Sequence, residues 1–162
     1  MRRRTATALF IPLLLAFTTA SRAQSTPACP WFTSGTAAKF LGGEVTAAVH
    51  AENNFEGSCT FIRQPGSQTI EVLVSKTNSD PCPKSSPIVK ALGNEAVQCR
   101  RTNPQNQIMN TIAGRVRDVY FVVTMINVPD ATREPSPDTR PADPYSASLL
   151  ERAAEQVAGN LF

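Results

Sequence analysis

Four cysteines, Cys29, Cys59, Cys82 and Cys99, restrict the folding of this chain more than any other feature of its sequence. No two of them have the close spacing of zinc or thioredoxin-like redox sites, and the chain has a single histidine. We therefore expect no metal site and no cofactor. An even number of cysteines favours disulfides in a chain that leaves the cytoplasm. Three connectivities are open. We favour Cys29–Cys59 with Cys82–Cys99, because sequence neighbours close the shorter loops, each stabilising the fold by about 3–4 kcal/mol.

The first 23 residues are typical of a secretory signal peptide. A basic segment at residues 2–4 precedes an apolar run at about 8–17, and Ser21 and Ala23 fit a cleavage site before Gln24. The apolar run is shorter than the ~20 residues of a membrane span, and no second long run follows. We expect cleavage near Ala23/Gln24, a secreted or periplasmic location, and no stable membrane insertion afterwards.

Removal of this segment changes the charge of the chain. The full sequence has 16 basic and 13 acidic residues, but four arginines belong to residues 1–23, so residues 24–162 carry 12 basic and 13 acidic residues. Their formal charge is −1, which gives no reason to expect a nucleic-acid partner. The remaining length suits a single domain with its own core, at residues 24–162.

The residue pattern predicts an early helix, a set of strands and a late helix. A short helix is expected after Thr33 or Ser34, ending at Gly42 or Gly43. Ser148 and Glu151 form a capping-box pattern before an amphipathic C-terminal helix.

Alternating apolar residues predict strands at residues 44–52, 59–64 and 69–77, with a hairpin turn at residues 65–67. Residues 88–101 are expected to begin as a helical turn and then become extended. Residues 107–128 are expected to form two strands that turn near Arg117 and Asp118. A proline-rich loop is expected at about 129–144. The prediction is an α+β fold, in which an N-terminal and a C-terminal helix cover an antiparallel sheet of about five to six strands.

Several segments also follow an order that resembles a known family. They read CPWFTSGTAAKFLGGEV, GSCTFIRQPGSQTIEVLV, IVKALGNEAV and GRVRDVYFVVTMI, followed by the amphipathic helix. This order resembles small secreted bacterial proteins of unknown function, largely actinobacterial lipoproteins, similar in fold to the extracellular sensor domain of mycobacterial serine/threonine kinases. The resemblance implies a helix-covered antiparallel sheet, disulfides and a ligand-binding or sensing role.

Four arginines are the candidate ligand-binding residues. Arg115 and Arg117 alternate on an expected strand and so are expected to share a face. If Arg100 and Arg101 fold near them, the group would offer planar paired donors to a phosphate or carboxylate. The alternative is a charged sheet edge that discourages aggregation.

Other candidates have simple structural interpretations. His50 stands alone, so it lacks the partners of a catalytic histidine. Trp31, Tyr120 and Phe121 could line a pocket or pack in the core. Glu95 could stabilise a turn or pair with an arginine.

The sequence contains none of the common hydrolase, metalloprotease, P-loop or dinucleotide-binding motifs. These observations favour a secreted, non-enzymatic module of the bacterial envelope that binds or senses an unknown small ligand. One alternative is a protein–protein interaction module whose partner is an envelope protein. A second is a small secreted hydrolase.

Overall fold

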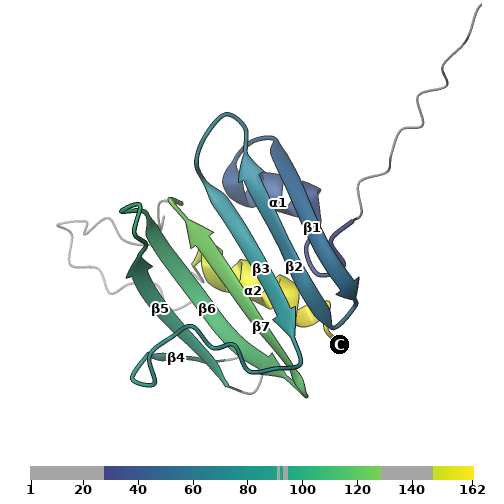
Figure 1. Cartoon of the computed structure of the whole chain (residues 1–162), viewed down its shortest axis with the longest axis vertical. Coiled ribbons are helices and arrows are strands. Elements are labelled where there is room, and N and C mark those ends of the chain that lie inside the picture. Colours follow the sequence, from purple (N-terminus) through teal and green to yellow (C-terminus); the bar gives the residue numbers. More distant parts are fainter. Residues whose placement is uncertain (1–27, 91, 93–94, 129–147) are drawn as a thin grey trace, which may run out of the picture.

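The computed structural model describes residues 28–90, 92, 95–128 and 148–162 (Figure 1). The expected signal peptide and the proline-rich loop lie outside the described residues. In chain order the elements are α1 (Ser34–Leu41), β1 (Val45–Asn53), β2 (Glu56–Arg63), β3 (Thr69–Ser75), β4 (Ile88–Val89), β5 (Ala96–Thr102), β6 (Ile108–Val116), β7 (Val119–Ile126) and α2 (Leu149–Gly159).

The strands form one antiparallel sheet of seven strands, in the order β1-β2-β3-β7-β6-β5-β4. Two meanders, β1 to β3 and β4 to β7, meet where β3 pairs with β7. The α+β class is confirmed, but the sheet exceeds the expected five to six strands.

The extra strand is β4, and the expected helical turn at its position is wrong. Ile88 and Val89 pair with Val97 and Ala96 of β5. Both residues are β-branched, which favours an extended backbone. This segment also provides hydrogen-bond partners for the outer edge of β5. There the Gln98 N–H donates to the Pro87 carbonyl at 3.0 Å.

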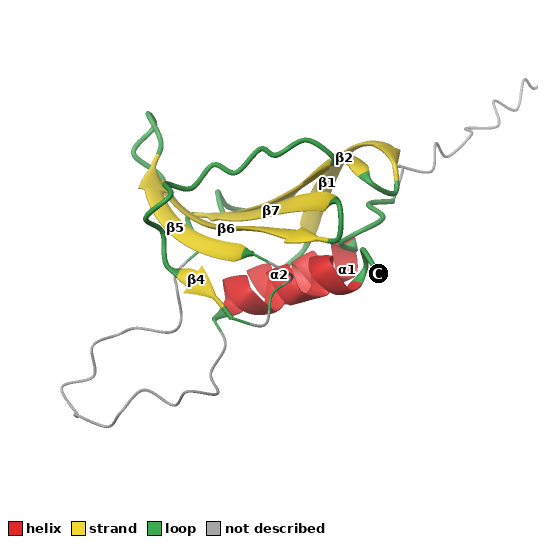
Figure 2. Cartoon of the chain, turned by 90° about the horizontal axis from the view of Figure 1, so that it is seen from below, coloured by secondary structure: helices red, strands yellow, loops and turns green. Residues whose placement is uncertain are grey.

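Both helices pack against the same face of the sheet (Figure 2). Alternate strand residues point to this side, so the core forms between the sheet and the helices. On β3 these residues are Ile70, Val72 and Val74, all fully buried. The buried residues of α2 are Leu150, Ala153, Ala154, Val157 and Ala158.

The helix ends follow the sequence signals. The Thr33 side chain accepts from the Thr36 N–H at 3.1 Å, and Gly42 ends α1 with φ of 69°. At α2 the Glu151 N–H donates to Ser148 Oγ at 3.1 Å, and the Ser148 N–H donates to the Glu151 carboxylate at 2.8 Å. These contacts satisfy backbone groups that a helix leaves free, which fixes where both helices begin.

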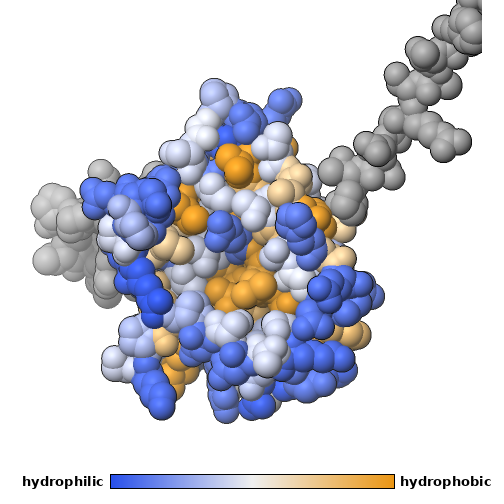
Figure 3. Space-filling model, in the orientation of Figure 1, coloured by the Kyte–Doolittle hydropathy of each residue, from blue (hydrophilic) through white to orange (hydrophobic). Residues whose placement is uncertain are grey.

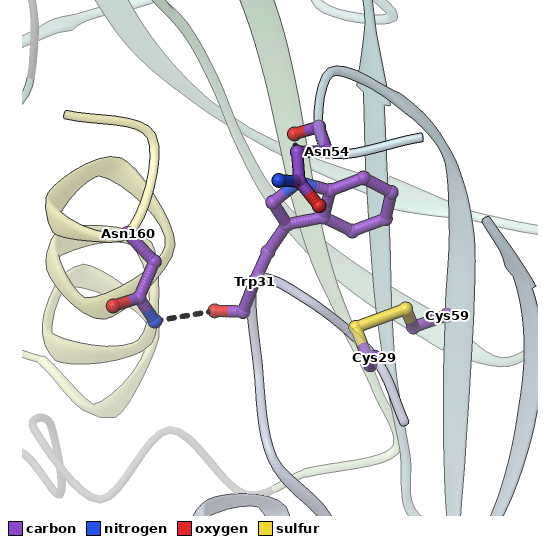
Figure 4. The surroundings of a disulfide bond; sticks show 5 residues. All are labelled: Cys29, Trp31, Asn54, Cys59 and Asn160. Atoms are coloured by element: carbon purple, nitrogen blue, oxygen red, sulfur yellow. Dashed lines mark hydrogen bonds between the residues drawn. A yellow bond between two sulfur atoms is a disulfide. The ribbon is translucent and has the colours of Figure 1, made fainter. Parts of the chain in front are cut away.

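Trp31 ties three distant segments together (Figure 4). Its indole N–H donates to the Asn54 carbonyl at 2.6 Å, and its own carbonyl accepts from Asn160 Nδ2 at 2.9 Å. Beside it, Cys29 is bonded to Cys59 of β2. The segment before α1 is thereby fastened to the turn after β1, to β2 and to the end of α2.

Candidate functional site

The sheet face opposite the helices carries the candidate site, and we call it the open face. The strand register gives it a polar row in the middle and a more apolar row beside it. The polar row is Thr60, Glu71, Thr124 and Thr111, and the apolar row is Leu73, Val122, Ala113 and Val97. In Figure 3 an apolar patch lies over the middle of this face and is surrounded by hydrophilic side chains.

Residues 76–87, between β3 and β4, cross the open face, and we call them the tethered loop. Figure 2 shows this segment on the side of the sheet away from the helices. Cys82 of the loop is bonded to Cys99 of β5 and is buried. The two disulfides are the pairs favoured from the sequence. The loop is therefore held against the open face at its middle.

Short-range hydrogen bonds shape the tethered loop. The Asp80 N–H donates to Asn78 Oδ1 at 3.0 Å, and the Cys82 N–H donates to Asp80 Oδ1 at 2.8 Å. Such side-chain-to-backbone turns restrict the loop locally, and the disulfide restricts it globally. The polar side chains of the loop are thus presented from a defined backbone.

A pocket of about 180 Å³ lies between the tethered loop and the sheet. Its floor is apolar and comes from the sheet, at Val97, Ala113 and Val122. Its polar residues come from both sides: Asn78 and Asp80 of the loop, and Glu95, Arg115 and Tyr120 at the ends of the strands.

Arg115 is the central charged residue of this pocket. Its guanidinium carbon lies 5.9 Å from the centre of the Tyr120 ring, a distance at which a cation and an aromatic ring attract. Its Nη2 lies 3.5 Å from a carboxylate oxygen of Glu95. The Arg115 Nε is buried and has no hydrogen-bond partner among the described residues. This nitrogen is covered by protein atoms, so a ligand in the pocket would reach Arg115 through the exposed part of its side chain, which is 33% exposed.

The Arg115–Glu95 ion pair is too weak to prevent a ligand from binding to Arg115. Its separation exceeds the 2.7–2.9 Å of a strong charge-assisted hydrogen bond, and the Glu95 side chain is 73% exposed. Exposed pairs of this kind contribute about 0–1 kcal/mol. A bound carboxylate could replace Glu95 at the guanidinium at little cost.

A second hollow, of about 390 Å³, lies on the other side of the tethered loop. Ser79 and Pro81 of the loop line it, together with Glu71 and Leu73 of β3 and Arg101 of β5. Two buried threonines in its floor, Thr111 and Thr124, share a hydrogen bond of 3.1 Å. The loop thus divides the open face into two recesses, each with one arginine.

The structure does not bring the four candidate arginines together. Arg101 lies opposite Met109 in the sheet, six residues along β6 from Arg115, which is about 20 Å. Arg100 lies opposite Asn110 and is exposed. The distance arises because β5 and β6 are antiparallel, so residues early in β6 meet the end of β5.

The expectation that Arg115 and Arg117 share a strand face is also wrong. β6 ends at Val116, and Arg117 lies in the turn before β7 with φ of 57°. A left-handed residue breaks the alternation of a strand. The Arg117 guanidinium instead lies 5.6 Å from the centre of the Phe162 ring, outside the pocket.

The remaining candidates are divided between core and surface. Trp31 and Phe121 are buried, and His50 is exposed on the edge strand β1. Glu95 partners an arginine, as one of its two interpretations proposed. Within the described ranges, no group of three or more His, Cys, Asp and Glu residues is placed to hold a metal ion.

Sequence reasoning missed the contribution of the loop. Asn78 and Asp80 occur in a stretch, NSDPCPKSSP, that indicates only a polar loop. The signal that could have found them is Cys82, because its disulfide to a strand predicts that neighbouring residues lie over the sheet.

Comparisons with protein-family models, with curated proteins and with solved structures find no match to this chain. In the part of the chain that the structure describes, no helix has the length and apolar character needed to cross a membrane.

Proposed function

We propose that this protein is a secreted, non-enzymatic binding module of the bacterial envelope, which takes a small ligand on the open face beneath the tethered loop. The observation that carries this proposal is the pocket around Arg115. There a disulfide-held loop covers part of an otherwise bare sheet face, and the partly exposed Arg115 lines the recess with only the weak Glu95 ion pair at its guanidinium.

The pocket residues favour a ligand with both signs of charge. Arg115 offers donors to a carboxylate, whereas Asp80 and Glu95 offer acceptors to an ammonium group. A simple anion would be repelled by the two carboxylates, and a simple cation would be repelled by the guanidinium. The apolar floor adds room for a hydrocarbon side chain.

The size of the pocket narrows the ligand class further. At about 180 Å³ it is smaller than the ~300–1,000 Å³ typical of sites for drug-sized ligands. A free amino acid with an apolar side chain, or the end of a short peptide, matches the size and the charges. We therefore propose a small amphipathic zwitterion as the ligand.

Two further observations support the location. The two disulfides are typical of proteins that fold outside the cytoplasm, and residues 1–23 have the signal-peptide pattern. The order of sequence segments, which resembles that of secreted proteins similar in fold to kinase sensor domains, would fit a sensing role for the same face.

Thermal unfolding with small probes tests the ligand class. We expect L-leucine or L-phenylalanine to raise Tm, because a ligand that binds only the folded state stabilises it. Leucinamide, which lacks the carboxylate, and octanoate, which lacks the ammonium group, should raise it less.

A matched pair of variants tests the site. Arg115→Gln should abolish the rise in Tm caused by the amino acid, whereas Arg117→Gln should keep it, because Arg117 lies outside the pocket. If neither amino acid raises the Tm of the wild type, or if both variants respond equally, the proposed ligand class or the proposed site is wrong.

A further inference from the structure

Ala113 has the smallest side chain in the apolar floor of the Arg115 pocket. The register places it directly between Val97 of β5 and Val122 of β7, and all three residues line the pocket. Because neighbouring strands lie about 4.8 Å apart, the Cα atoms of the two valines are about 10 Å apart, with a single methyl group between their side chains. The floor is therefore a trough that is deepest at Ala113.

The trough is shielded from solvent by its surroundings. Ala113 is only 3% exposed and Val122 only 8% exposed, although both helices lie on the other side of the sheet (Figure 2). The tethered loop and the side chains of Arg115 and Tyr120 form walls around the floor. An apolar group that enters the pocket and reaches Ala113 therefore loses most of its contact with water, which favours its binding.

The polar groups of the strands lie at one end of this trough. Tyr120 pairs with Arg115 in the register, two residues along the strands from the pair of Val122 and Ala113. Two strand residues span about 7 Å, and Glu95 lies at the same end, beside Arg115. A ligand whose carboxylate binds Arg115 can therefore extend an apolar side chain of a few carbon atoms over Ala113.

We propose that Ala113 determines the side-chain preference of the pocket, a role that rests on the proposed function. The methyl group of Ala113 leaves space for a large apolar side chain of an amino acid, so such a side chain is preferred over a small one. In a hydrophobic pocket, one methylene group changes affinity by about 10–200-fold. L-leucine, whose side chain exceeds that of L-alanine by an isopropyl group, should therefore bind at least about tenfold more tightly.

Ala113→Leu tests this role by filling the trough while leaving Arg115 and Glu95 in place. We expect the ratio of the two dissociation constants, L-alanine over L-leucine, to fall from at least about ten in the wild type to about one in the variant. Isothermal titration calorimetry measures both constants. The matched control is Ser58→Leu, which adds leucine in the same row of the register but outside the pocket. The control should keep the wild-type ratio.

Val97→Ala tests the same role in the opposite direction, by widening the trough without adding atoms to the sheet. Val97 is half-buried at the side of the floor, and the substitution removes two methyl groups there. The affinity for L-phenylalanine relative to L-leucine should rise by about tenfold, because the wider trough fits a ring better than a branched chain. This variant decides the matter if Ala113→Leu does not fold.

The outcomes separate this role from the proposed function. If the wild type binds none of these amino acids, the proposed function fails, and the role of Ala113 fails with it. If the wild type binds L-leucine no more tightly than L-alanine, only the role of Ala113 is overturned. Equal ratios in Ala113→Leu and Ser58→Leu, or an unchanged preference in Val97→Ala, would also overturn that role alone.

Discussion

Gly57 stands at the most crowded backbone position of the β1–β2 hairpin. It lies opposite Ala51, beside the irregular pairing at the end of β1, and its φ is 143°. A Cβ at this position would overlap the carbonyl oxygen of His50. Both the backbone angle and the close approach therefore require glycine.

We predict that Gly57→Ala lowers the free energy of unfolding by about 2–4 kcal/mol, because the hairpin must distort to fit the methyl group. Gly159→Ala is the matched control, since a Cβ there meets nothing within 4 Å and the residue lies in α2. The control should be neutral or stabilising by about 0.4–1 kcal/mol. Urea unfolding measures both, and an equal effect of the two substitutions would contradict the steric argument.

At the same scale, Arg115 shows what a sequence can and cannot reveal about a site. Its residue type and its strand suggested an anion-binding role before any coordinates. Its partners could not be predicted, because Tyr120 comes from the next strand and Asp80 from a loop fixed by a distant cysteine. The grouping with Arg100, Arg101 and Arg117 failed because register and turn geometry, which the local pattern does not encode, separate them.

At the scale of elements, the tethered loop links stability to binding. The Cys82–Cys99 disulfide spans 17 residues and the Cys29–Cys59 disulfide spans 30. Both constrain the unfolded chain by about 3–4 kcal/mol. Only the first holds the loop that lines the Arg115 pocket.

We predict that replacing both Cys82 and Cys99 with alanine destabilises the protein by about 3 kcal/mol. The same change should abolish the response to amino acids, which is the added stability that L-leucine or L-phenylalanine gives to the folded protein. Replacing both Cys29 and Cys59 should destabilise it at least as much, because these two sulfurs are also buried in the core, yet leave the response of the folded fraction intact. Urea unfolding with and without L-leucine separates the two effects. Loss of the response in both double variants would mean that the loop has no specific part in binding.

The elements most readily predicted from sequence were those set by local contacts. The helix caps at Thr33 and Ser148 and the turn at Arg117 and Asp118 depend on residues close in the chain, and each formed where expected. The pairing of β3 with β7 joins Ile70 to Met125. Nothing in either strand alone specifies that partner, so the order of the sheet and the presence of β4 required the structure.

At the scale of the whole molecule, one face of the sheet forms the core with the helices, and the opposite face is the one on which we propose ligand binding. Two helices and the Cys29–Cys59 disulfide close one face of the sheet, and the other face carries the two hollows. The sequence left open whether helices would cover one face or both. The answer decides the function proposed here, since a sheet covered twice would have no open face.

The most direct test of a ligand on the open face is native mass spectrometry of the protein purified, without reductant, from the organism that makes it. We predict a stoichiometric extra mass, of the size of an amino acid or short peptide, on the wild type and on Arg117→Gln but not on Arg115→Gln. A wild-type protein that carries no added mass, and gains none when incubated with L-leucine or L-phenylalanine, would contradict the account.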